Sequence, residues 1–90
     1  MSRVRKSQLM LLEGWLRRMD RRMNPKLIDS PNYLNADFDN PVLVNWGSNG
    51  FYCPRDELEP LIDAMEDEHT TPNSFLHDTW MPFIREWADR

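Results

Sequence analysis

Apolar side chains recur at alternating spacings of three and four residues near the start of the chain. The residues that form this pattern are Leu9, Leu12, Leu16, Met19 and Met23. Such spacing places side chains on one face of an α-helix, so it predicts a long N-terminal helix with a buried apolar stripe. Ser2 or Ser7 is the expected N-cap, and Asn24-Pro25 is expected to end the helix because the residue before proline is pushed out of helical geometry. Gly14, in the helix interior, is expected to mark a close approach by another element.

The middle of the chain is rich in turn-forming residues. Residues 25–41 hold three prolines, three asparagines and three aspartates, which predicts irregular backbone. Two β-branched and aromatic runs, Val42–Trp46 and Phe51–Cys53, flank a glycine-containing turn at residues 47–50 and predict a short antiparallel β-hairpin. Because an isolated hairpin is marginally stable, we expect it to pack on the helices or to gain a third strand from around Lys26–Asp29.

Two further helices are predicted in the C-terminal part. In the second helix of the chain the apolar face is formed by Leu58, Leu61, Ile62 and Met65, and in the third helix by Leu76, Trp80, Phe83 and Trp87. Asp56 and Glu59 have the spacing of a capping box for the second helix, and Pro60 belongs in its first turn. Thr71, followed by proline, is the expected N-cap of the third helix, which Pro82 should kink.

These elements together predict an α+β fold. It consists of a long N-terminal helix, a loop-rich middle with a short antiparallel β-hairpin, and two C-terminal helices. Residues 1–90 form a single domain in this prediction, because so short a chain cannot fill two cores. The centres of the two strongest stripes, Leu12, Leu16, Trp80 and Phe83, are expected in that core.

Charge is distributed unevenly along the chain, although the net charge is only −4. Residues 1–26 hold eight basic and two acidic side chains, and residues 27–90 hold three basic and thirteen acidic ones. Opposite the apolar stripe of the first helix project Arg17, Arg18, Arg21 and Arg22. Opposite the apolar face of the second helix project Asp56, Glu59, Asp63, Glu66 and Asp67.

No set of residues resembles a catalytic or metal-binding motif. The acidic segment at residues 35–39 begins like a calcium loop, but asparagine and tryptophan occupy the positions that need glycine and glutamate. His69 and His77 lack the helical spacing of a zinc pair, and Cys53 has no motif partner. We therefore expect neither an enzyme nor a cofactor or metal.

The single cysteine cannot form an intramolecular disulfide, which favours a reducing compartment. No apolar run is long enough for a signal peptide or a membrane span. These features predict a cytoplasmic protein without a membrane partner.

The acidic row suggests a function. Closely spaced carboxylates can imitate a phosphate backbone, so we expect a non-catalytic protein-binding module that acts as a small inhibitor or regulator of the phage type. Its partner would be a larger protein or complex with a basic surface that handles nucleic acid.

Other interpretations of the same charges stay open. The arginine face of the first helix could bind DNA, RNA or an acidic protein. Both charged faces could instead serve solubility, with the arginines partly neutralised by the acidic helix. A third alternative is a structural subunit that oligomerises through exposed aromatic residues, and the sequence allows either a monomer or a homodimer.

Overall fold

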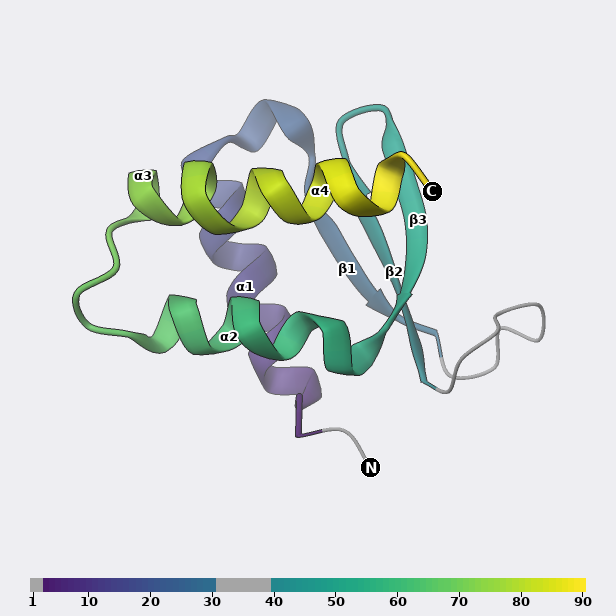
Figure 1. Cartoon of the computed structure of the whole chain (residues 1–90), viewed down its shortest axis with the longest axis horizontal. Coiled ribbons are helices and arrows are strands. Elements are labelled where there is room, and N and C mark those ends of the chain that lie inside the picture. The colour runs from purple at the N-terminus through teal and green to yellow at the C-terminus, as the bar shows by residue number, and fades with distance from the viewer. Residues whose placement is uncertain (1–2, 31–39) are drawn as a thin grey trace.

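The structure is a computed structural model that describes residues 3–30 and 40–90, and it shows the predicted α+β fold (Figure 1). The helices are α1 (Lys6–Met19), α2 (Glu59–Glu66), α3 (Pro72–Phe75) and α4 (Met81–Ala88). The strands are β1 (Lys26–Asp29), β2 (Pro41–Trp46) and β3 (Asn49–Pro54). Two 3-10 turns, η1 (Arg21–Met23) and η2 (Arg55–Leu58), and one π-helical turn, η3 (Leu76–Trp80), complete the order.

Helix α1 forms where the apolar stripe predicts it, but both of its ends differ from the prediction. It begins after Arg5, whose backbone N–H donates to the Gln8 side chain at 2.7 Å, so Ser7 lies inside the helix and is not its cap. Ser2 lies outside the described residues. The helix ends at Met19 rather than at Asn24, because the chain leaves helical geometry at the next residue and folds back through η1 toward β1.

Gly14 does not mark a close approach by another element of residues 3–30 and 40–90. A Cβ atom built on Gly14 would meet nothing within 4 Å, apart from the helix itself. That prediction is wrong, since the buried face of α1 is the opposite one, with Leu9, Leu12 and Leu16.

The sheet has three antiparallel strands in the order β1-β2-β3. The third strand predicted at Lys26–Asp29 is confirmed. The hairpin turn is shorter than predicted, because Asn49 already pairs with Trp46 and only residues 47 and 48 form the turn. Gly47 has a φ of +63°, and a positive φ at the first turn residue is what a tight type II′ hairpin requires.

The C-terminal helices follow the prediction in part. Thr71 caps α3, because its hydroxyl oxygen accepts the Ser74 backbone N–H at 3.1 Å. The capping box predicted at Asp56 and Glu59 does not form, since η2 precedes α2 and places Asp56 inside a 3-10 turn. Just before Pro82 the helix widens into the π-helical turn η3, which changes the hydrogen bonding where proline offers no N–H.

An aromatic core joins the helices to the sheet. Trp80 is fully buried, and its ring lies 5.6 Å from that of Trp46 in β2 and 5.5 Å from that of Phe83. Leu12 and Leu16 reach the same core from α1, so all four predicted core residues are buried. None of the four tryptophans is exposed, so none supports oligomerisation through exposed aromatic residues.

Candidate protein-binding surfaces

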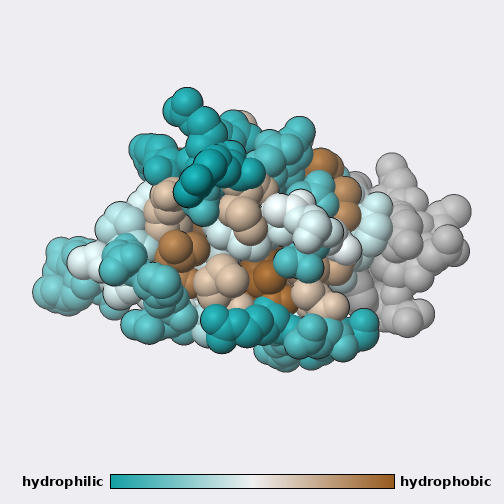
Figure 2. Space-filling view, turned by 90° about the horizontal axis from the view of Figure 1, so that it is seen from above, coloured by the Kyte–Doolittle hydropathy of each residue, from teal (hydrophilic) through white to brown (hydrophobic). Residues whose placement is uncertain are grey.

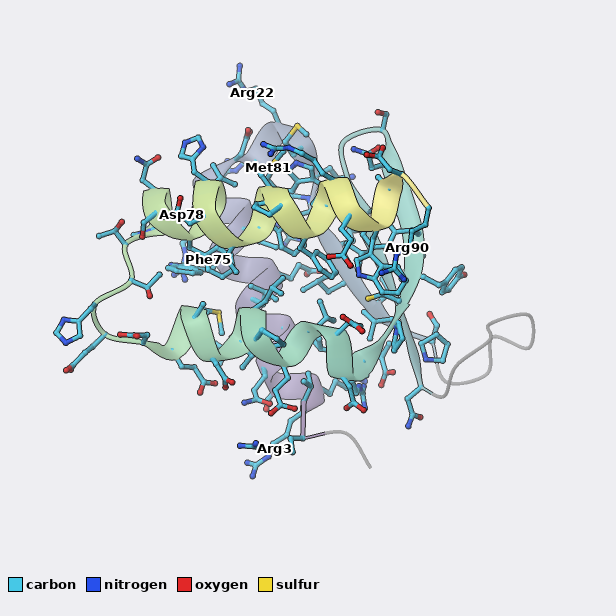
Figure 3. The ribbon with its side chains drawn as sticks, in the orientation of Figure 1. Arg3, Arg22, Phe75, Asp78, Met81 and Arg90 are labelled. Carbon is cyan, nitrogen blue, oxygen red and sulfur yellow. The ribbon has the colours of Figure 1, made fainter. Side chains whose placement is uncertain are left out.

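The carboxylates predicted as a partner-binding surface lie on η2, α2 and the start of the turn that follows. These residues, the acidic row, are Asp56, Glu59, Asp63, Glu66 and Asp67. All are exposed except Glu59, which is half-buried. Figure 3 shows carboxylate oxygens along the side of α2 that faces away from α4. The structure therefore brings the predicted residues together along one edge of the molecule.

Two members of the acidic row hold the N-terminal part of the chain. Arg3 Nη1 lies 3.0 Å from Glu59 Oε1, and Gln8 Nε2 donates to Glu66 Oε1 at 3.1 Å. Between these contacts lies a depression of about 100 Å³, which Asp63 also lines. Ordinary ligand pockets measure roughly 300 to 1,000 Å³, so this depression suits one side chain of a partner better than a small-molecule substrate.

Three exposed carboxylates of this region have no polar partner among the described residues and are called here uncompensated. Asp56, Glu57 and Asp63 make no side-chain hydrogen bond or ion pair with the described part of the chain. Glu57 was missed by the sequence analysis, because helical spacing excluded it from the acidic row; it is exposed and follows Asp56 directly in the 3-10 turn η2. Asp67 has a local role, since its Oδ1 accepts the His69 backbone N–H at 2.9 Å.

The four predicted arginines lie elsewhere and are exposed. Arg22 and Arg3, from the two ends of the α1 region, point to opposite sides of the molecule (Figure 3). Arg22 Nε lies 3.9 Å from Asp20 Oδ1, and no ion pair involves Arg18 or Arg21 within residues 3–30 and 40–90. In the same ranges, α2 carboxylates form their one ion pair with Arg3. The acidic helix therefore does not neutralise the arginine face.

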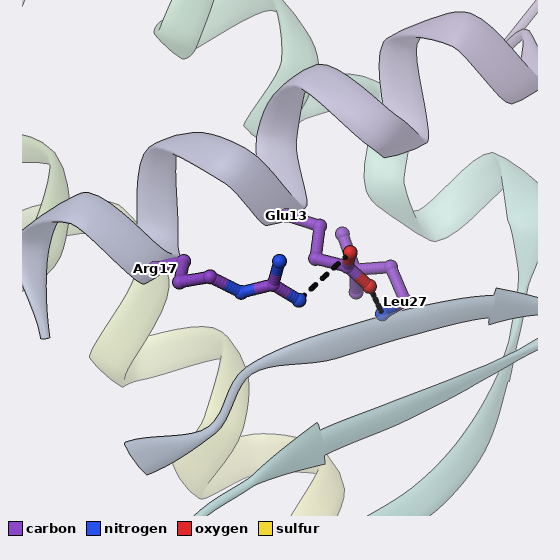
Figure 4. A network of polar contacts seen from close by, with 3 residues as sticks. All are labelled: Glu13, Arg17 and Leu27. Atoms are coloured by element: carbon purple, nitrogen blue, oxygen red, sulfur yellow. Dashed lines mark hydrogen bonds and ion pairs between the residues drawn. The ribbon is translucent and has the colours of Figure 1, made fainter. Parts of the chain in front are cut away.

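Arg17 belongs to a contact that fastens α1 to the sheet (Figure 4). Glu13 Oε1 accepts the backbone N–H of Leu27 in β1 at 2.9 Å, and Glu13 Oε2 lies 3.2 Å from Arg17 Nη2. Among the described strands β1 is an edge strand, and Glu13 thus satisfies an N–H on its outer side that no described strand covers. Its charge is balanced by Arg17, which leaves that arginine less available to a partner.

Apolar side chains reach the surface on the upper side of the molecule, on α1 and, at Ile28, on β1. Seen from above, apolar side chains gather between hydrophilic margins (Figure 2), and Met81 lies on this upper side in Figure 3. Met81, like Met19 and Met23, is partly buried and packs against the core. Met10 and Leu11 on α1 are far more open, with 67% and 61% of their surface exposed.

The cysteine thiol and the side chains that could bind a metal ion are the remaining candidates for a chemical role. Burial, and secondarily the charge of Glu57, raise the pKa of the Cys53 thiol to about 12, so at neutral pH it is a thiol rather than a nucleophilic thiolate. Among the described residues, no three His, Cys, Asp or Glu side chains are grouped to hold a metal ion. Asn35, Asp37 and Asp39 lie outside those residues. No helix in the described ranges is long and apolar enough to cross a membrane.

No protein-family model, curated protein or solved structure matches this chain. Its surface chemistry is therefore the basis on which a function can be proposed.

Proposed function

We propose that this domain is a non-catalytic protein-binding module whose acidic row binds a basic surface on a larger protein. The three uncompensated carboxylates of Asp56, Glu57 and Asp63 carry this proposal. Asp63 also lies four residues after Glu59 and three before Glu66. Like charges at this spacing destabilise a helix by roughly 0.2 to 0.5 kcal/mol per pair, and a basic partner would relieve that repulsion. The depression beside Asp63 would accept a lysine or arginine side chain of the partner.

The spacing of the charges favours a partner that handles nucleic acid. Carboxylates three and four residues apart on a helix lie about 5 to 6 Å from one another, and a nucleic-acid strand also presents a row of closely spaced negative charges. A domain that occupies such a partner's basic groove would exclude the nucleic acid. We therefore propose an inhibitor or regulator that works by blocking this groove. The buried free thiol of Cys53 is compatible with the reducing cytoplasm, where we propose that it acts.

Two variants of equal net charge test the proposal. Asp56→Asn/Glu57→Gln/Asp63→Asn removes the uncompensated carboxylates and changes the net charge from −4 to −1. The control, Asp78→Asn/Glu86→Gln/Asp89→Asn, makes the same charge change in the η3–α4 region.

Wild type and both variants serve as baits in nuclease-treated extract of the source cells. A partner that wild type and control retain is then purified, and its affinity for each is measured. We expect the first variant to bind at least roughly tenfold more weakly than the control. Equal affinities for the two variants would show that net charge alone, or another surface, determines binding.

A further inference from the structure

Helix α1 presents a second surface of different chemistry. Its solvent side, called here the outer face, is formed by residues that recur every three or four positions. They are Ser7, Met10, Leu11, Gly14, Arg17, Arg18 and, continuing into η1, Arg21. Met10 and Leu11 are the two most exposed large apolar side chains of the described residues, at 67% and 61%.

The exposure of Met10 and Leu11 is not forced by the core. Helix α1 already buries Leu9, Leu12 and Leu16 on its opposite side. Single exposed apolar residues are ordinary, but these two are adjacent, and Gly14 follows one turn later. A glycine in a helix interior costs about 1 kcal/mol relative to alanine, and no contact in the described molecule requires it, since nothing lies within 4 Å of its Cβ position. An external backbone could approach α1 closely at this point.

The charges around this apolar centre define what could cover it. The carboxylates of α1 and its end are engaged, Glu13 by Leu27 and Arg17, and Asp20 by Arg22 at 3.9 Å. Arg18 and Arg21 have no such partner in the described ranges. The outer face therefore has an apolar centre at Met10 and Leu11 and uncompensated positive charge toward the C-terminal end of α1.

The exposed apolar residues and the nearby arginines together indicate which kind of molecule could bind the outer face. In a symmetric dimer a second copy would bring the same arginines together, which is unfavourable. The acidic helix α2 of a second copy could not cover Met10 and Leu11 either, because Leu61 and Ile62 on its apolar side are buried. Nucleic acid would leave Met10 and Leu11 uncovered, because phosphates offer them no apolar contact. A membrane surface needs a longer apolar face, and Leu9, Leu12 and Leu16 of α1 are already in the core.

We propose that the outer face docks an acidic amphipathic helix of a partner protein. The apolar side of that helix would cover Met10 and Leu11 and cross α1 near Gly14. Its carboxylates would pair with Arg18 and Arg21. This surface is independent of the acidic row, so the domain would contact two partners of opposite charge.

A synthetic helical peptide with leucine on one side and glutamate on the other is the probe. Titration into the isotope-labelled domain, followed by NMR, should shift amide signals of the outer face. A peptide with glutamine in place of glutamate should bind at least roughly tenfold more weakly at low salt. Met10→Ser/Leu11→Ser should cause a similar loss, whereas Ile28→Ser should not, because Ile28 is an exposed apolar control on β1.

Three results would overturn this proposal. The first is equal binding of the glutamate peptide by Met10→Ser/Leu11→Ser and wild type. The second is tighter binding of duplex DNA, or of vesicles of phosphatidylserine and phosphatidylcholine, to the same residues at the same salt. The third is self-association in sedimentation that the double serine variant abolishes. Asp56→Asn/Glu57→Gln/Asp63→Asn should bind the peptide at least as tightly as wild type, so failure of the acidic-row proposal would be recognised separately.

Discussion

Alanine at Gly14 and alanine at Gly47 should change the stability of the fold in opposite directions. At Gly14 the added methyl group meets nothing within 4 Å, so the substitution should stabilise the domain by about 0.5 to 1 kcal/mol through helix propensity. At Gly47 the φ of +63° is unfavourable for alanine, at a cost of about 1 to 2 kcal/mol. The new Cβ would also lie 2.7 Å from Met23 Cε, but that methyl group ends a flexible side chain and can move.

Urea unfolding followed by tryptophan fluorescence measures both changes. The two variants should differ by about 2 kcal/mol, and each kcal/mol corresponds to roughly 4 to 8 °C in Tm for a domain of this size. Gly47→Asn is the control, because asparagine tolerates a left-handed backbone better than alanine and should cost less despite its size. Destabilisation by Gly14→Ala would mean that α1 is covered at that point in the folded chain. An unchanged midpoint for Gly47→Ala would refute the turn geometry.

Three further substitutions test the core, the buried thiol and the edge of the sheet. Leu16→Ala should lower the free energy of unfolding by about 2 to 5 kcal/mol and exposed Leu11→Ala by less than about 0.5 kcal/mol; similar urea midpoints would contradict the orientation of α1. The Cys53 thiol has a pKa near 12 when folded against an ordinary 9.0, so the unfolded chain binds fewer protons between these values. Stability should therefore fall by about 1.4 kcal/mol per pH unit as pH rises through that window, and Cys53→Ala should show a shallower fall, whereas equal slopes would refute burial of the thiol. Glu13→Ala should lower the free energy of unfolding by about 1 to 3 kcal/mol because it leaves the Leu27 N–H without an acceptor. Glu13→Gln should cost less because its side chain keeps an acceptor oxygen. If neither variant changed the free energy of unfolding, the hydrogen bond would not contribute to stability.

Local patterns predicted most of the fold. The stripe of Leu9, Leu12 and Leu16 indicates a helix because burial and helical period coincide within a few turns. The end of α1 was misplaced because it depends on the return of the chain to pair β1 with β2, which is a long-range contact. The π-helical turn before Pro82 was also missed, although Trp80 at its end and Phe83 after it lie in the core as their spacing predicts.

The candidate surfaces were predicted less completely. Helical spacing placed Asp56 and Asp63 on one side, but it could not show that Glu59 and Glu66 are engaged by residues near the N-terminus. Gln8 and Glu66 are 58 positions apart in the chain. The same spacing identified the arginines, while the exposure of Met10 and Leu11 became visible only when the opposite side of α1 was seen to fill the core.

The association rate of the purified partner with the domain tests the acidic-row proposal most directly. It is measured at ionic strengths of about 0.01 M and about 0.15 M, which shorten the Debye length from about 30 Å to about 8 Å. Wild type and Asp78→Asn/Glu86→Gln/Asp89→Asn should associate fast at low salt and slow markedly at high salt. Asp56→Asn/Glu57→Gln/Asp63→Asn should associate slowly with little salt dependence. If that variant keeps the wild-type rate and salt dependence, while Arg18→Glu/Arg21→Glu loses them, binding occurs on the arginine face and the central proposal is wrong.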